Sequence, residues 1–401
     1  MTTTSELSES LRTLLPAGGT IALGDGVGAL RTLEDGQPVG AVLSDTARQI
    51  GTVRLVLGWL PAPQNGIDPD AFAEVIALMP GWGLRDLLRC PPARFVPTPL
   101  SAIPALLAGS LRPDVLITRL VERGGRLHFG TEVSWQRGLV ESGVPVLAIL
   151  DTTAPTASAE APVNPDQVTL AGRTCDGPLR MPYKGPEPVY EALAEAVLRF
   201  VPAGARLQYG PGQLGTALLS RTTVPLRIDT GLLTDAVVDL DKRGLLAATP
   251  SASYLLGSQT LYDWADGKPI LRGIEHTHDI TRLSNGDPFV AVNTAIEIDP
   301  VGQINVEGIG DNVFGGIGGH PDYCAAASRS RGGLSIIAVP SSNEGRSPLV
   351  QALSRPASTP AYDVDLIVTE SGCADLRGAD WQQRRRLITE LFSDWGQATD
   401  A

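Results

Sequence analysis

Two glycine-marked loops in the C-terminal half of the chain hold residue types that can perform chemistry. The first, GGIGGHPDY at residues 315–323, has four glycines in five residues and includes Gly316, Gly318 and Gly319. Glycine lacks a Cβ atom, so such a loop lets backbone amides approach a ligand closely. His320 follows directly and can act as a general base on water. The pattern predicts a ligand-binding loop; a bare turn with a hydrogen-bonded histidine is the alternative.

The second loop, VTESGCADLRG at residues 368–378, places Glu370 at the end of the apolar run VDLIVT. Open α/β sheets bind their ligands at the carboxyl ends of the strands. A carboxylate at that edge can orient a substrate, or transfer a proton if burial raises its pKa. The alternative is a structural carboxylate that caps a helix or forms an ion pair within the loop.

An internal repeat indicates which elements position these loops. LLPAGGTIALGDGVGALRTL at residues 14–33 lines up with RFVPAGARLQYGPGQLGTALL at residues 199–219, and in both copies a strand is predicted to end at a glycine turn that a helix follows. Further strands are predicted at residues 53–60, 115–121, 144–150, 334–340 and 364–370, and helices at residues 70–79, 188–201 and 381–392. This alternation indicates an α/β fold with mostly parallel sheets. We predict two similar α/β domains, at residues 1–185 and 186–401.

The turns GDGVGA and GPGQLG in this repeat also fit the dinucleotide-binding fingerprint, which follows a strand and opens a helix. A glycine turn between strand and helix is common in α/β folds, and Pro211 removes a backbone donor from the second turn. We therefore interpret both as tight turns and keep NAD binding as the alternative.

Composition excludes several classes of protein. The net charge of −12 argues against a nucleic acid or an anionic membrane as partner. The chain has no apolar run of the roughly 20 residues that a spanning helix needs, and its first residues lack the pattern of a signal peptide, so we expect a cytoplasmic protein. The four cysteines are scattered without metal-ligand spacing, so we expect no metal site.

Several segments together resemble the acetyl-CoA hydrolase/transferase family, of the 4-hydroxybutyrate CoA-transferase type within the class I CoA-transferase superfamily. NTAIEIDPVGQ at residues 293–303, GIGGH and VTESGCADLRG follow the family's order and spacing, and the resemblance runs from about residue 93 to residue 392. It implies a CoA-transferase-like protein of two α/β domains that binds an acyl-CoA at the domain interface. It also implies a CoA thioester as substrate with no tightly bound cofactor, and a small carboxylate as a further partner. The assembly implied is a homodimer, or a heteromer with a related subunit.

The resemblance also implies roles for individual residues. The loop with Gly316, Gly318 and Gly319 would hold the oxyanion that forms at the thioester carbonyl. Gly212 and Gln213, in GPGQLG, would belong to the substrate-binding residues, as would Gly231. Glu370 and Asn285 match active-site residues of the family, and we expect both to face one cavity, although Asn285 also fits an ordinary turn.

The chain departs from the family at the nucleophile. In LRIDTGLLTDAVVDL, at residues 226–240, the family's glutamate falls on Gly231. Asp229 is the nearest carboxylate, about 6.6 Å away along a strand, which is too far for in-line attack. We therefore predict water-dependent hydrolysis of an acyl-CoA at a thioester or C–C bond, with Glu370, Asn285 and His320 as catalytic residues. The alternatives are CoA transfer to a carboxylate with another nucleophile, and an inactive CoA-ester-binding protein or subunit of a related enzyme.

Overall fold

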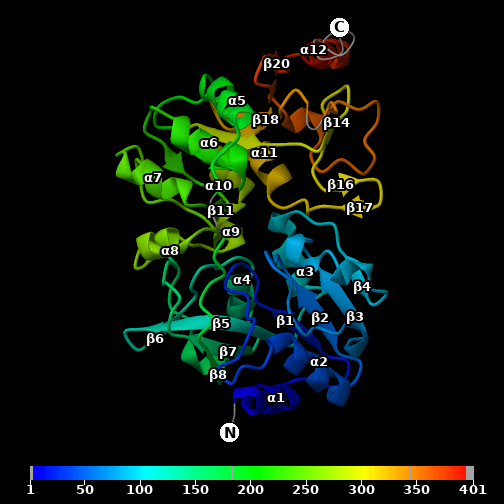
Figure 1. Ribbon diagram of the computed structural model, residues 1–401, viewed down its shortest axis with the longest axis vertical. Helices are drawn as coiled ribbons and strands as arrows, with labels where there is room; N and C mark the ends of the chain where they lie inside the picture. Colours follow the sequence, from blue (N-terminus) through cyan, green and yellow to red (C-terminus); the bar gives the residue numbers. More distant parts are fainter. Residues whose placement is uncertain (1–2, 182–183, 343–344, 394–401) are drawn as a thin grey trace. The chain divides into compact units, whose positions relative to one another are not determined.

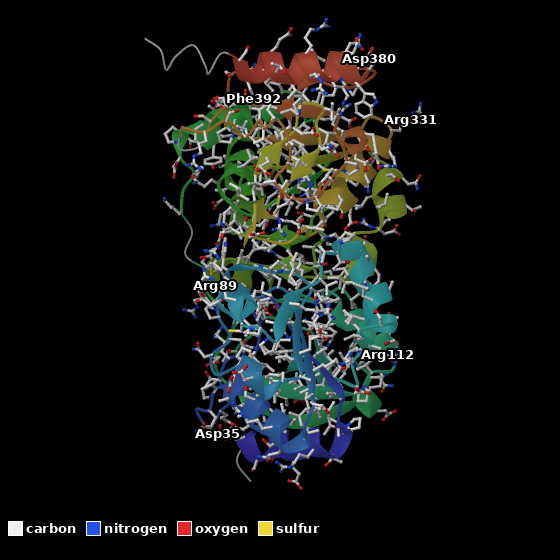
Figure 2. The ribbon with its side chains drawn as sticks, turned by 90° about the vertical axis from the view of Figure 1, so that its right-hand side faces the viewer. Asp35, Arg89, Arg112, Arg331, Asp380 and Phe392 are labelled. Atoms are coloured by element: carbon white, nitrogen blue, oxygen red, sulfur yellow. The ribbon has the colours of Figure 1, made fainter. Side chains whose placement is uncertain are left out.

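The computed structural model describes residues 3–181, 184–342 and 345–393 (Figure 1). The chain divides into two compact units, which are described separately. Unit 1 comprises Met1–Met181, Ser253–Glu275 and Phe314–Gly316, and unit 2 comprises Pro182–Ala252, His276–Val313 and Ile317–Ala401. The charged side chains labelled in Figure 2 are exposed on the surfaces of these units, whereas Phe392 is buried.

Unit 1 is built on a sheet in the order β4-β3-β2-β1-β5-β7-β8, in which neighbouring strands are parallel, and β6 pairs antiparallel with β5. Its strands are β1 (Thr20–Leu23), β2 (Arg54–Leu57), β3 (Glu74–Ala77), β4 (Ala93–Phe95), β5 (Val115–Arg123), β6 (Arg126–His128), β7 (Val146–Asp151), β8 (Val168–Thr174) and, outside this sheet, β12 (Tyr254–Leu255). Its helices are α1 (Thr3–Leu14), α2 (Val39–Ile50), α3 (Ile103–Ala108), α4 (Gln136–Glu141) and α8 (Gln259–Ala265). Apolar residues of α1, α2 and the central strands form one buried core.

Unit 2 contains a sheet in the order β10-β9-β13-β18-β19-β20, parallel except for β20. Its strands are β9 (Arg206–Tyr209), β10 (Arg227–Ile228), β11 (Leu232–Leu233), β13 (Phe289–Asn293), β14 (Glu297–Ile298), β15 (Ile304–Asn305), β16 (Gly308–Ile309), β17 (Asn312–Val313), β18 (Leu334–Ala338), β19 (Leu366–Val368) and β20 (Cys373–Asp375). Its helices are α5 (Pro188–Leu198), α6 (Gln213–Arg221), α7 (Ala236–Lys242), α10 (Ile280–Ser284), α11 (His320–Arg329) and α12 (Trp381–Ser393), and α9 (Ile274–Thr277) runs from the end of unit 1 into unit 2. Helix α11 packs on β13 and β18.

The predicted α/β class is confirmed, with a mostly parallel sheet in each unit. Strands β18 and β19 lie within the predicted runs 334–340 and 364–370, and α5 and α12 lie at the predicted helices. All residues of these two strands are buried, which explains their continuous apolar sequence.

The helix predicted at residues 70–79 is wrong, because this segment forms β3 between β2 and β4. Val75, Ile76 and Ala77 are fully buried. A strand covered on both faces loses the polar–apolar alternation, so periodicity cannot distinguish it from a buried helix.

The first glycine turn also differs from the prediction, because α2 begins only at Val39, well after GDGVGA. Asp25 of this turn is buried and accepts hydrogen bonds from Ser134 Oγ at 2.9 Å, Trp135 Nε1 at 2.9 Å and Tyr254 Oη at 2.8 Å. The Gly28 amide donates to Glu132 Oε2 at 3.0 Å. The turn thus anchors polar side chains of the protein, which favours its interpretation as structural.

Candidate active site

Gly231 lies at the carboxyl edge of the unit 2 sheet, three residues after β10. Two residues before it, the Asp229 amide donates to Leu207 O at 3.1 Å and continues the pairing of β10 with β9. Thr230 Oγ1 donates to Tyr209 O at 2.9 Å, at the end of β9. The backbone leading to Gly231 is thereby fixed against the neighbouring strand, at the edge where open α/β sheets bind ligands.

Two side chains from other elements converge on Gly231. A Cβ atom built on Gly231 would lie 3.1 Å from Tyr323 Oη and 3.3 Å from His278 Nε2. A Cβ atom on Gly319 would lie only 2.5 Å from His278 Nε2 and 2.7 Å from Tyr323 Cε2. The two rings are 4.8 Å apart between centroids, tilted by 44°. His278 and Tyr323 therefore occupy the space that a side chain at Gly319 would need, and they closely approach Gly231.

The polar atoms of this pair are buried and unpaired. His278 is 1% exposed and Tyr323 is 3% exposed. Neither His278 Nε2 nor Tyr323 Oη has a hydrogen-bond partner among the described residues. A buried polar atom without a partner costs about 1–3 kcal/mol, and such atoms are rare enough in folded proteins to need an explanation.

Burial keeps both groups neutral. Burial, and to a smaller extent the nearby Arg282 guanidinium, lowers the pKa of His278 from 6.5 to about 3. Burial also raises the pKa of Tyr323 well above 10, and the charge of Asp229 adds to the increase. Near neutral pH the site therefore presents a neutral imidazole and a neutral phenol.

The segment that carries His278 is tied to the strand that leads to Gly231. Arg282 donates from Nη1 and Nη2 to the two carboxylate oxygens of Asp229, both at 2.8 Å, and from Nε to His276 O at 2.7 Å. His278 Nδ1 lies 2.9 Å from Thr277 Oγ1, which fixes the plane of the imidazole. The Asp229 carboxylate thus positions the segment that carries His278.

His320 begins α11 and is buried, with both ring nitrogens engaged. Its Nδ1 lies 2.6 Å from Thr359 Oγ1, and its Nε2 lies 3.0 Å from the carbonyl oxygen of Thr294. Burial lowers its pKa to about 4. His320 therefore has the contacts of a hydrogen-bonded loop histidine, which was the alternative interpretation from the sequence.

Glu370 and Asn285 lie at opposite edges of the sheet. Glu370 follows the carboxyl end of β19, and its carboxylate accepts hydrogen bonds from the amide and hydroxyl of Ser341. Asn285 precedes β13, is exposed, and donates to Thr281 O at 2.7 Å. Because β13, β18 and β19 run parallel, the expectation that the two side chains face one cavity is wrong. Glu370 instead lines a pocket of about 210 Å³ with Arg199 and Cys373.

The glycines of the predicted binding loops have distinct environments. Gly318 has a φ of 62°, in the left-handed region that favours glycine, and Gly319 caps α11. Gly316 belongs to unit 1, where a Cβ atom would lie 3.0 Å from Pro80 Cδ. Gly212 precedes α6 with a φ of 121°, and Gln213 accepts a hydrogen bond from the Glu187 amide at 2.7 Å.

The sequence analysis missed His278 and did not single out Tyr323. Tyr323 ends the motif GGIGGHPDY, and His278 is one of only four histidines in the chain, so a survey of histidines was the available signal. The described residues contain no group of three or more metal-ligating side chains that can hold a metal ion. None of the helices in the described part of the chain has the length and apolar character needed to span a membrane.

Comparison with known proteins finds similarity to one family of enzymes. A model of the acetyl-CoA hydrolase/transferase C-terminal domain matches residues 257–392. The 4-hydroxybutyrate coenzyme A transferase of Clostridium kluyveri is 25% identical, over 79% of this chain and 78% of that protein. The succinyl-CoA:cyclohexane-1-carboxylate CoA transferase of Geobacter metallireducens is 28% identical, over 84% of each chain. An acetyl-CoA hydrolase of Candida albicans is 28% identical, over 58% of this chain and 48% of that protein.

Solved structures show the same fold. RipA from Yersinia pestis aligns over 100% of this chain and 96% of its own, with a TM-score of 0.85 and 21% identity. A 4-hydroxybutyrate CoA-transferase from Porphyromonas gingivalis aligns over 98% of this chain and 96% of its own, with a TM-score of 0.75 and 20% identity. The fold is therefore that of CoA-transferases, as the sequence predicted.

Proposed function

We propose that this chain hydrolyses an acyl-CoA with water as the acyl acceptor, a proposal that its similarity to the acetyl-CoA hydrolase/transferase C-terminal domain and to CoA-transferases and an acetyl-CoA hydrolase supports. The water oxygen attacks the thioester carbonyl carbon and the C–S bond breaks. The products are a carboxylic acid and CoA, whose thiolate takes up the proton that water loses. Transfer to a second carboxylate through a covalent enzyme adduct would instead need a nucleophilic side chain.

The observation that carries this proposal is the surroundings of Gly231. Its place in LRIDTGLLTDAVVDL is where the family resemblance predicts the nucleophilic glutamate. Tyr323 Oη and His278 Nε2 already lie 3.1 Å and 3.3 Å from where even a Cβ atom would stand. Both distances are shorter than most contacts of a Cβ atom, so a side chain at this position would require the two rings to shift by a few tenths of an ångström. The nearest carboxylate in sequence, Asp229, is held by Arg282 on both of its oxygens.

The remaining predicted site residues support this proposal unequally. Glu370 lies beside a pocket at the carboxyl edge, and three strands separate its strand β19 from β10, so we assign it the role of binding a part of the substrate away from the thioester. Gly318 and Gly319, before α11, suit the binding of the thioester end of the substrate. His320 and Asn285 engage other protein atoms, so we expect positioning roles for them.

The test is the fate of the acyl group. Purified protein is incubated with short and medium acyl-CoA esters in water enriched in oxygen-18, with and without added acetate or succinate, and the thiol released is measured with a chromogenic disulfide. Hydrolysis predicts thiol release without an added acid and one labelled oxygen in the acid product. Conversion of the added carboxylate into a new acyl-CoA without release of thiol, or a borohydride-sensitive protein–CoA adduct, would establish transfer instead. Acyl-CoA binding without turnover would identify an inactive binding protein.

A further inference from the structure

The buried pair beside Gly231 suggests a catalytic device made of side chains. Tyr323 Oη and His278 Nε2 both border the place of a Cβ atom on Gly231, at 3.1 Å and 3.3 Å, and both are unpaired among the described residues. We propose that His278 and Tyr323 donate hydrogen bonds to the carbonyl oxygen of the substrate and stabilise the oxyanion formed there. This inference rests on the proposed function and names the residues that lower the activation barrier of the hydrolysis.

The charge state of the pair fits donors better than a base or a nucleophile. A general base works best with a pKa near the working pH, whereas burial lowers the pKa of His278 to about 3 and so opposes proton uptake. Arg282, on α10, opposes an imidazolium as well, and the carboxylates of Asp229 and Asp322 raise the pKa of Tyr323. Both groups therefore stay neutral, and a neutral imidazole and a neutral phenol can each donate one hydrogen bond.

As a donor, His278 must carry its ring proton on Nε2, and the contact of Nδ1 with Thr277 permits this tautomer. His278 Nδ1 lies 2.9 Å from Thr277 Oγ1. When the threonine hydroxyl donates to Nδ1, the ring proton is on Nε2, the atom that faces Gly231. A neutral histidine that polarises a carbonyl is an established form of electrophilic catalysis in other enzymes.

Two glycines border the buried donor atoms. Gly231 and Gly319 are partly exposed, while the donors beneath them are buried. A Cβ atom on either glycine would crowd His278 Nε2. Tyr323 lies one helical turn after Gly319 in α11, and its amide donates to Gly319 O at 3.0 Å, so the glycine and the phenol are positioned by the same helix. Fixed donors in a site shielded from water are effective because they need no reorganisation during the reaction.

The experiment measures carbonyl polarisation and turnover separately. The carbonyl stretch of carbon-13-labelled acetonyl-CoA, a ketone analogue that cannot be hydrolysed, is recorded by infrared spectroscopy on wild-type protein and on Tyr323→Phe, His278→Leu and His278→Gln. We expect the lowest frequency on the wild type, a higher one on Tyr323→Phe and His278→Leu, and an intermediate one on His278→Gln, whose amide retains a donor. The kcat for acyl-CoA hydrolysis should fall by roughly 10²- to 10³-fold in Tyr323→Phe, with little change in KM.

The outcomes separate this inference from the proposed function. Equal carbonyl frequencies in all four proteins would overturn the donor pair, even if the wild type hydrolyses acyl-CoA. A polarised carbonyl on a wild type that releases no thiol would support the donor pair and remove hydrolysis. An acyl-histidine adduct at His278, detected by mass spectrometry, would show that this residue is a nucleophile and would also overturn the inference.

Discussion

Replacing Tyr323 by phenylalanine should make the protein more stable and less active. The substitution keeps the buried ring and removes only the hydroxyl, which has no partner among the described residues. An unpaired buried polar group costs about 1–3 kcal/mol. We therefore expect the free energy of unfolding to rise by about 1 kcal/mol, at the low end of this range because residual solvation recovers part of the cost.

Tyr209 supplies a matched control in the same unit. It is 1% exposed, and its hydroxyl accepts a hydrogen bond from the Thr234 amide at 3.4 Å. Tyr209→Phe removes the same atom but takes the acceptor from a backbone amide, so it should lower the free energy of unfolding by about 1 kcal/mol. The pair thus differs in the sign of the effect, although the chemical change is identical.

The assay is urea unfolding followed by circular dichroism, without ligand, on the wild type and both variants. A higher urea midpoint for Tyr323→Phe at an unchanged slope indicates greater stability rather than an altered unfolded state. If Tyr323→Phe loses as much stability as Tyr209→Phe, the Tyr323 hydroxyl has a structural partner, and the reasoning that reserves it for substrate is refuted.

Three further substitutions test the surroundings of this pair. Gly319→Ala places a Cβ atom 2.5 Å from His278 Nε2, so overpacking should lower the free energy of unfolding by about 1–3 kcal/mol and abolish most activity. Gly185→Ala, whose Cβ atom meets open space, should change neither urea unfolding nor turnover. Burial lowers the pKa of His278 from 6.5 to about 3, so the unfolded chain binds more protons than the folded chain between these pH values. The free energy of unfolding should therefore fall as the pH decreases through this window. In urea midpoints measured against pH, His278→Gln should show a weaker dependence than the wild type. Asp229→Asn removes a buried ion-pair partner and should lower the free energy of unfolding by about 3–5 kcal/mol. Asp287→Asn, in an exposed pair, should lower it by under about 1 kcal/mol. Equal urea midpoints for the two variants would show that the Asp229 pair does not position the site.

Local sequence was sufficient for much of the fold. The apolar runs at residues 334–340 and 364–370 predicted β18 and β19, and the amphipathic pattern of α12 predicted a helix. In each of these elements the buried residues recur at a fixed spacing along the chain, so the types of neighbouring residues are enough to predict the element. The same reasoning failed at β3, where neighbours on both sides bury the strand and remove the pattern.

The site was predictable only in part. The glycine-dense loop predicted the close approach of a ligand, and the groups nearest to a Cβ atom on Gly319 in the fold are His278 and Tyr323 of the protein itself. The sequence shows a glycine at position 231, where the family resemblance predicts a glutamate, but it does not show the two rings that lie beside this glycine. A glycine-rich segment indicates that side chains are excluded from a loop, but it does not indicate which neighbouring atoms exclude them.

The sequence by itself determined the α/β class, the resemblance to CoA-transferases and the glycine at position 231. Only the tertiary structure decided that His278 and Tyr323 converge there, that Asp229 is bound by Arg282, and that Glu370 and Asn285 lie at opposite edges of the sheet. The physical reason is that a strand or helix depends on side chains a few residues apart. The site depends on loops and helix ends that lie far apart in the chain and meet only when the sheet and its helices pack together.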